Sequence, residues 1–430
     1  MKTSDIFGIR PTLSDYSYVD RKNLDTELAK LLGRQQTHIA VRGASKSGKS
    51  WLRQKVLSNP IIIQCRLSYD VVDIYKDALA ELGISVEIEH KTGKTLTGHV
   101  TGVAEAGIPL LTKVSAELEL EGETRTEITK KILGRDINDL KFVSTLIKAS
   151  GRTLVIEDFH YLKTEEQKKF SYDLKTLWDY NTFVMIVGVW ISENMLITLN
   201  PDLADRIEEL SVTWQPEELK RVLTQGCGYL NLRLSDKVAD ELSEISYGSV
   251  GLLQKLTLRM IDDELGIEKG EEAGTELLLA DDKFVHDAAM HVAEQLNMLY
   301  QAFAKRVSDG IRNRKNSTGI YAHAMAAIMS ASDSDLVNGL SAKALHAVAH
   351  ARQPRVQYGN LKTVLTRFPE LQIDEGGRGL VIAYDTLDEK VSVVDKQLLL
   401  YRKFATIKWP WEEIIDEVGV KEDVYGDDVD

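Results

Sequence analysis

One eight-residue segment constrains this chain more than any other, because a fixed pattern occurs there in a fixed context. Residues Gly43–Ser50 read GASKSGKS, which matches G-x-x-x-x-G-K-[ST]. The β-branched residues before it predict a short buried strand over Thr37–Arg42, and a helix is predicted over Trp51–Leu57. The two glycines let the backbone bend so that consecutive N–H groups surround phosphate groups, and the helix N-terminus adds a favourable dipole. The segment is therefore predicted to be a phosphate-binding loop.

The side chains of this loop indicate the ligands. Lys49 can place a positive charge on the β- and γ-phosphates of a nucleoside triphosphate, and the Ser50 hydroxyl can coordinate Mg²⁺. ATP and Mg²⁺ are accordingly the expected ligands. The nucleotide-binding residues predicted from the loop are Gly43, Ser45, Lys46, Ser47, Gly48, Lys49, Ser50 and Trp51.

Such a loop requires an acidic strand nearby, and Thr153–Asp158 has the expected pattern. A hydrophobic strand that ends in two carboxylates places one near the Mg²⁺ shell and the other near the attacking water. By position, Glu157 is the metal-side acid and Asp158 is the candidate base. Because the more usual order is Asp followed by Glu, an exchange of these two roles stays open.

Further strands and helices around these motifs predict the fold class. Ile61–Arg66 and Thr182–Trp190 are continuous apolar segments, as strands covered on both faces are. Helical patterns over Asp136–Ser150 and Thr164–Tyr180 lie among the strands. Alternating strands and helices predict an α/β fold with a parallel sheet and helices on both of its faces.

Two features of this region leave alternatives open. Ser192, Glu193 and Asn194 follow the last predicted strand, where a polar side chain either senses the γ-phosphate or caps a helix. Residues 84–128 alternate like half-exposed strands and predict a β-rich insertion. This insertion is expected either to contact a partner or to form a surface loop.

The composition excludes other classes of protein. A chain of 430 residues with 43% hydrophobic and 28% charged residues has the balance of a folded protein of two to four domains. Its two cysteines, Cys65 and Cys227, exclude a disulfide framework and fit a reducing cytosol. The first ten residues lack the apolar core of a signal peptide, and no apolar run is long enough to cross a bilayer. A cytoplasmic protein without membrane contact is therefore expected.

The last third of the chain predicts a winged helix. Helices are predicted over 284–309, 321–330, 341–350 and 358–368, followed by strands over 380–384 and 391–394. The last three of these helices and the hairpin of the two strands are typical of a winged helix. The third helix of such a module can enter a DNA major groove. Residues 343–403 carry ten basic and seven acidic side chains, against a net charge of −13 for the whole chain. This weak basic excess leaves DNA contact and protein contact equally open. The candidate contacts are Arg355, Lys362, Arg367 and Arg378.

These motifs resemble those of the AAA+/STAND P-loop ATPases, near the origin-recognition and helicase-loader ATPases and the transposon-targeting ATPases of the TnsC/TniB type. The resemblance covers about residues 15–265. The segment Tyr18–Arg21 resembles the family's motif at the nucleotide edge, which adds Tyr18 and Arg21 to the predicted site. Glu157–Tyr161 resembles the acidic strand with its aromatic continuation. The stretch from Gly188 to Ile207 resembles the segment from sensor 1 to the arginine finger, which implies catalytic roles for Asn194 and Arg206.

The resemblance also implies ATP sites at subunit interfaces and a helical lid over Pro216–Ile261. Here the chain departs from the family, because Gly248–Gly251 lacks the sensor-2 arginine that origin-recognition relatives carry. Lys255 and Arg259 are candidate substitutes. The departure favours a slow switch over fast steady-state hydrolysis.

The sequence thus predicts a P-loop ATPase core over residues 1–210, with the insertion, and a helical lid over 211–265. A linker and long helix follow over 266–315, then a winged helix over 316–410 and an acidic tail over 411–430. The predicted function is an ATP-hydrolysing, homo-oligomeric switch that acts on DNA or on a partner effector protein. By resemblance, its setting is a bacterial mobile element or antiphage defence. The alternative is an NTP-sensing, DNA-binding transcription or replication regulator with little turnover.

Overall fold

The computed structural model describes residues 1–90, 96–104, 110, 132–190, 193–270, 276–310, 318–372, 380–386, 388–405 and 408–417. The chain divides into two compact units. The first, here called the sheet unit, comprises Asp20–Gly43 and Lys49–Val212. The second, here called the helical unit, comprises Met1–Val19, Ala44–Gly48 and Thr213–Asp430. Each unit is described by itself.

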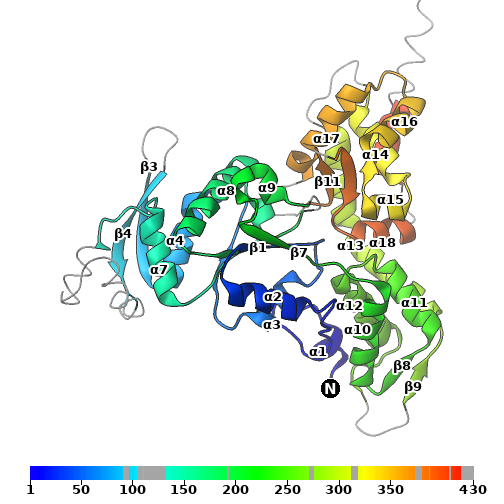
Figure 1. Ribbon diagram of the computed structural model, residues 1–430. Helices are drawn as coiled ribbons and strands as arrows, with labels where there is room; N and C mark the ends of the chain where they lie inside the picture. Colours follow the sequence, from blue (N-terminus) through cyan, green and yellow to red (C-terminus); the bar gives the residue numbers. More distant parts are fainter. Residues whose placement is uncertain are drawn as a thin grey trace, which may run out of the picture. The chain divides into compact units, whose positions relative to one another are not determined.

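The sheet unit is built on a parallel sheet with strand order β2-β5-β6-β1-β7. Figure 1 labels the neighbouring strands β1 and β7 of this sheet. The strands of this sheet are β1 (His38–Arg42), β2 (Ile61–Gln64), β5 (Leu154–Glu157), β6 (Val184–Gly188) and β7 (Ile207–Ser211). The helices are α2 (Leu24–Arg34), α3 (Lys49–Val56), α4 (Val71–Glu81), α7 (Leu140–Ser150), α8 (Thr164–Asp179) and α9 (Met195–Leu199), with 3₁₀ turns η2 (Phe159–Tyr161) and η3 (Pro201–Leu203). All four described pairings between these strands are parallel, which confirms the predicted parallel sheet.

Alternate residues of the central strands enter two separate cores, one on each face of the sheet. Ile39 and Val41 of β1 pack with leucines of α2 and α3, whereas Ala40 packs with residues of α4, α7 and α8. The same alternation holds in β5, where Val155 joins the first core and Ile156 the second. This period of two places helices on both faces, as the apolar strand patterns predict.

The predicted β-rich insertion begins with an antiparallel pair. β3 (Ile84–His90) pairs with β4 (Leu96–Val103) along its whole length, with an irregularity between Ser85 and Val86. The amides of Val100 and Ile137 bond to Arg135 and Gly98 respectively, which ties β4 to the chain that follows the insertion. The second predicted strand of the insertion, at Val114–Leu120, lies outside the described residues.

The helical unit contains the remaining elements. They are α1 (Thr3–Phe7), α10 (Pro216–Gly228), β8 (Leu232–Leu234), α11 (Asp236–Ile245), α12 (Val250–Leu258), a π-helical turn η4 (Arg259–Glu264), β9 (Leu277–Leu279), α13 (Lys283–Asp309), α14 (Ile320–Met329), α15 (Asp333–Asn338), β10 (Leu340–Ser341), α16 (Ala342–Arg352), α17 (Tyr358–Gln372), β11 (Ile382–Asp385), β12 (Lys390–Val393) and α18 (Gln397–Phe404). Serine side chains at 235, 249, 332 and 341 accept backbone N–H groups at the starts of α11, α12, α15 and α16. These caps satisfy donors that a helix start leaves open.

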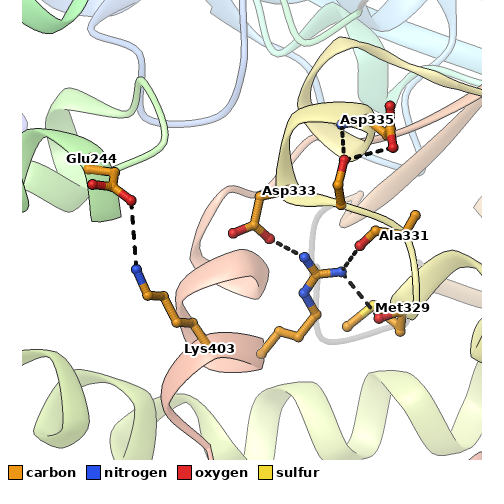
Figure 2. A network of polar contacts seen from close by, with 8 residues as sticks. Glu244, Met329, Ala331, Asp333, Asp335 and Lys403 are labelled. Carbon is orange, nitrogen blue, oxygen red and sulfur yellow. Dashed lines mark hydrogen bonds and ion pairs between the residues drawn. The ribbon is translucent and has the colours of Figure 1, made fainter.

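A small antiparallel sheet has strand order β10-β12-β11. Strand β10 lies between α15 and α16, whereas β11 and β12 follow α17. Helix α18 then joins neighbouring parts of the unit (Figure 2). The Arg402 guanidinium donates to the carbonyl oxygens of Met329 at 3.2 Å and Ala331 at 2.7 Å, and it pairs with the Asp333 carboxylate. The next residue, Lys403, places its Nζ 4.0 Å from Glu244 of α11. One guanidinium therefore satisfies the carboxyl end of α14 and fixes the start of α15.

A buried cation at the start of α18 makes the stability of the chain depend on pH. Lys396 is 8% exposed, and burial lowers the pKa of its ammonium from 10.5 to about 8. Unfolding returns the ordinary pKa, so the unfolded chain binds more protons between about pH 8 and 10.5 and stability rises with pH across that window. Below pH 8 the buried charge opposes folding by roughly 3 kcal/mol, at about 1.4 kcal/mol per pKa unit.

We therefore expect Lys396→Met to stabilise the protein at pH 7 by about 2–3 kcal/mol, because the buried charge is removed. Urea unfolding at pH 7 and at pH 10 measures the effect, and the advantage of the variant should shrink at pH 10. Lys390→Met at an exposed position of β12 is the control and should change neither value. A constant difference between Lys396→Met and wild type at both pH values would contradict the argument.

None of the helices in the described ranges is both long enough and apolar enough to span a membrane.

Candidate functional site

The loop between β1 and α3 has the backbone conformation that its glycines permit. Gly48 has φ +85°, which L side chains rarely adopt, and Lys46 lies in the left-handed region at φ +58°. Helix α3 begins directly after the loop, at Lys49. The loop thus leaves the carboxyl end of a central parallel strand and enters a helix N-terminus, where anions bind favourably.

Lys49 is a desolvated cation within the sheet unit. Its Nζ donates to the Gly43 carbonyl oxygen at 3.0 Å. Burial lowers the pKa of the Lys49 ammonium from 10.5 to about 8, while the nearby Asp158 carboxylate raises it and the Arg21 guanidinium lowers it. Arg21 is 1% exposed, and its positive charge acts on Lys49. An anionic ligand would relieve the repulsion between these two cations.

The two predicted acids have different partners. Glu157, the last residue of β5, lies with Oε2 3.5 Å from the Ser50 hydroxyl and Oε1 2.8 Å from Arg53 Nε of α3. Asp158 has φ +56°, and its Oδ2 accepts from Gln64 Nε2 of β2 at 3.0 Å. A hydroxyl beside a carboxylate is the hard oxygen set that Mg²⁺ prefers, so Ser50 and Glu157 fit this ion. Sequence reasoning missed Arg53 and Gln64, since the motif pattern leaves both positions open.

The exit of β6 differs from the sequence-based expectation. The strand ends at Gly188, Val189 and Trp190 follow it directly, and a Cβ at position 188 would lie 2.4 Å from the Trp190 ring. Asn194 is exposed at the start of α9, where its backbone N–H donates to Glu209 at 3.2 Å. Ser192 lies outside the described residues. The sequence left two roles open for Asn194, a γ-phosphate sensor or a helix cap. The described contacts place Asn194 at a helix start and do not place its side chain near Lys49.

His160 is a residue near the acids that sequence reasoning did not select. Its ring stacks on Tyr161 with centroids 4.3 Å apart, and its Nδ1 accepts the Val189 N–H at 3.3 Å. Burial lowers the pKa of His160 to about 4, while the charge of Asp158 raises it and that of Lys49 lowers it. His160 therefore lies near both the predicted base and the phosphate-binding lysine.

Arg206 lies at the amino ends of the parallel strands, whereas the loop follows the carboxyl end of β1. Its carbonyl oxygen accepts from His38 N at 2.8 Å, where β1 and β7 begin. Its guanidinium lies over the Trp178 ring of α8, 4.7 Å from the centroid, and donates to the Asp202 carbonyl oxygen. The five residues of β1 separate this edge from the loop by about 16 Å.

Within the helical unit, two contacts hold loop residues 44–48. Trp214 Nε1 donates to the Ser47 carbonyl oxygen at 2.9 Å, and the Gly251 N–H donates to the Lys46 carbonyl oxygen at 3.1 Å. A Cβ at position 251 would lie 2.8 Å from Lys46 Cβ, so this approach requires glycine. Burial lowers the pKa of Lys255 in α12, and the neighbouring Lys46 charge lowers it further.

The N-terminal segment is also fixed inside this unit. Gln225 of α10 donates its amide to the carbonyl oxygens of Asp15, Tyr16 and Tyr18 at 3.1–3.2 Å. Tyr18 thus belongs to a segment whose backbone α10 holds. Trp214 and Gln225 carry no motif signal and could not have been selected from the sequence.

The candidate contacts of the C-terminal region do not form one group. Lys362 of α17 is ion-paired with Glu389, which also accepts the Tyr358 hydroxyl at 2.6 Å. Arg355 and Arg367 are exposed, and Arg378 lies outside the described residues. Among the described residues, no three His, Cys, Asp or Glu side chains are grouped for a metal ion.

Comparisons with known proteins add evidence on the fold. No protein-family model matches the chain, and no curated protein matches it. A Walker-type ATPase of Pyrococcus abyssi is similar in structure with a TM-score of 0.50 at 13% identity, covering 93% of this chain and 99% of that one. The Orc1 protein of Aeropyrum pernix, solved in complex with DNA, has a TM-score of 0.37 at 12% identity, covering 98% of each chain. A STAND ATPase with a tetratricopeptide repeat sensor from Pyrococcus horikoshii has a TM-score of 0.35 at 13% identity, covering 95% of this chain and 46% of that one.

The likeness to the Pyrococcus abyssi protein, together with the parallel sheet and the loop after β1, shows that this chain has the α/β fold of P-loop ATPases. The predicted fold class of the core is therefore confirmed. The predicted domain boundaries and the winged helix remain predictions.

Proposed function

We propose that this chain binds and hydrolyses ATP with Mg²⁺ and acts as a homo-oligomeric switch. The observation that supports this most directly is the different placement of the two acids at the end of β5. Glu157 lies beside the Ser50 hydroxyl, whereas Asp158 is bonded to Gln64 and lies close enough to Lys49 to raise its pKa. A metal-side acid and a separate base beside a buried lysine are the parts that phosphoryl transfer to water requires.

The residues of the sheet unit have distinct roles in this proposal. Lys49 binds the β- and γ-phosphates, and its contact with the Gly43 carbonyl keeps the ammonium in place before the nucleotide arrives. Ser50 and Glu157 hold the ion, and Arg53 orients the Glu157 carboxylate. When bound, Mg²⁺ neutralises charge on the phosphate oxygens. Asp158 accepts a proton from the water whose oxygen attacks the γ-phosphorus, while the bond from that phosphorus to the bridging oxygen breaks and ADP leaves.

The helical unit supports a slow reaction. Burial lowers the pKa of Lys255 in α12, and the charges of Lys46 and Arg259 lower it further, whereas Asp395 raises it. The segment Gly248–Gly251 has no sensor-2 arginine. We therefore propose that turnover is slow and depends on assembly.

The position of Arg206 supports assembly. It directly precedes β7 at the amino ends of the parallel strands, whereas Lys49 follows the carboxyl end of β1. Since β1 separates the two by about 16 Å, Arg206 cannot reach the nucleotide of its own subunit. A guanidinium can instead stabilise the γ-phosphate of a neighbouring subunit, as an arginine finger does.

We expect Arg206→Ala to keep the ATP affinity of the wild type and to lose assembly-dependent hydrolysis by about 10³-fold, the contribution of an arginine finger. Light scattering with and without ATP measures assembly, and phosphate release at several protein concentrations measures turnover. Trp178→Leu is the matched control, because it removes the local ring contact of Arg206 and leaves the guanidinium.

Two results would contradict this role. If light scattering gave the same molecular mass with and without ATP, assembly would no longer be part of the proposed function. Equal loss of stability in Arg206→Ala and Trp178→Leu, with unchanged turnover in both, would make Arg206 a local packing residue.

The target of the switch is proposed from the C-terminal region. Helices α14, α16 and α17 followed by β11 and β12 have the element order of a winged helix, which supports DNA or a partner effector protein as the target. Because Glu389 neutralises Lys362, the exposed Arg367 is the better candidate for DNA contact. The resemblance to transposon-targeting ATPases supports a mobile-element or antiphage setting. If residues 316–410 bound DNA without any effect of ATP, the regulator with little turnover would be the better function.

A further inference from the structure

The two described residues that directly follow β6 carry no polar side chain for a γ-phosphate sensor. The strand ends at Gly188, and the next two residues are Val189 and Trp190. Asn194 comes six residues after the strand, and its backbone is bonded to Glu209 instead. Among the described residues, a polar group for this role is therefore sought on a neighbouring element.

His160 supplies a polar group at this place. It belongs to η2, directly after Asp158, and its Nδ1 accepts the N–H of Val189 at 3.3 Å. An imidazole nitrogen that accepts a hydrogen bond carries no proton, so the proton of the neutral ring is on Nε2. Stacking on Tyr161 fixes the plane of the ring.

The Nε2–H group is a donor without an acceptor in the described part of the chain. The ring is half-buried, and the charges of Lys49 and Asp158 both act on it. Because Nε2 already carries the proton, this nitrogen cannot act as a base and can only donate. A donor beside the phosphate-binding lysine and the candidate base is suited to an anionic oxygen.

We propose that His160 donates its Nε2–H to an oxygen of the terminal phosphate of bound ATP and serves as the γ-phosphate sensor of this chain. This inference rests on the proposed ATP binding. The bond between Nδ1 and Val189 connects the sensing ring to the end of β6, so an occupied terminal phosphate is linked to both β5 and β6. ADP lacks the acceptor, and His160 therefore favours ATP over ADP.

Two variants distinguish the role of Nδ1 of His160 from that of Nε2. His160→Asn retains an acceptor where Nδ1 lies and removes the distal donor, whereas His160→Gln can place an amide donor near the position of Nε2. Binding of ADP and of a non-hydrolysable ATP analogue to the full chain is measured by calorimetry. We expect His160→Asn to lower the preference for the analogue over ADP by about tenfold, with ADP affinity unchanged, and His160→Gln to restore part of the preference.

A second measurement does not depend on the variants. In ¹⁵N-histidine spectra of the wild type, the analogue should shift the Nε2–H signal of His160 and ADP should not. An unchanged preference in both variants, or an equal shift with both nucleotides, would overturn the inference and leave ATP binding intact. If the wild type bound neither nucleotide, the proposed function itself would fall.

Discussion

Replacing Lys49 with alanine will abolish measurable ATP binding, with a loss of affinity on the order of 100-fold or more. The ammonium is the charge that the loop directs at the β- and γ-phosphates, and hydrogen bonds to charged groups contribute about 1.5–3 kcal/mol each. Lys49 is half-buried, and its Nζ donates to the Gly43 carbonyl oxygen at 3.0 Å. Calorimetric titration with ATP and Mg²⁺ measures the effect.

This variant should not unfold the protein. Burial lowers the pKa of Lys49 to about 8, so the folded chain holds this charge at a cost. Removing the charge should leave the stability without nucleotide unchanged or slightly raised, as thermal unfolding would show. Lys55→Ala, at an exposed position of the same helix, is the control and should bind ATP like the wild type. Normal ATP affinity in Lys49→Ala would refute the assignment of the loop.

Asp158→Asn should bind ATP and Mg²⁺ normally and should lower hydrolysis by roughly 10²–10⁴-fold, the contribution of a general base. An asparagine cannot accept the proton of the attacking water, but its side-chain oxygen can still accept the bond from Gln64. Single-turnover hydrolysis together with an ATP titration separates the chemical step from binding.

Glu157→Gln is the informative comparison, because the two acids have different partners. We expect this change to weaken the Mg²⁺ dependence of binding and to lower stability. The Arg53 side chain, which is 9% exposed, would then face a neutral amide in place of a carboxylate. If Asp158→Asn lost Mg²⁺ dependence and Glu157→Gln lost only turnover, the roles of the two acids would be exchanged.

Several parts of the candidate site could be predicted from the sequence because the chemistry there is local. A phosphate-binding loop needs consecutive backbone N–H groups and one lysine, so its signal lies within Gly43–Ser50. The acidic strand and the apolar strands likewise carry their patterns within a few residues. These short patterns were sufficient for the loop, for the two acids and for the parallel α/β fold.

The remaining site contacts join residues that lie far apart in the chain. Arg53 and Glu157 are 104 residues apart, and Gln64 and Asp158 are 94 apart. They meet because β5 lies next to β2 in the order β2-β5-β6-β1-β7, and no periodicity specifies strand order. The same reason explains why Asn194 was selected at the β6 exit and His160 was not.

The sequence by itself determined which backbone segment forms the proposed phosphate-binding loop and which residue types are available for the proposed hydrolysis. Only the tertiary structure decided which acid lies beside Ser50, that Trp214 and Gly251 hold loop residues 44–48, and that Glu389 neutralises Lys362. The physical reason is that a backbone turn and a strand pattern are set by neighbouring residues. The partner of a buried charge is set by which strands and helices pack together, and this depends on the whole chain.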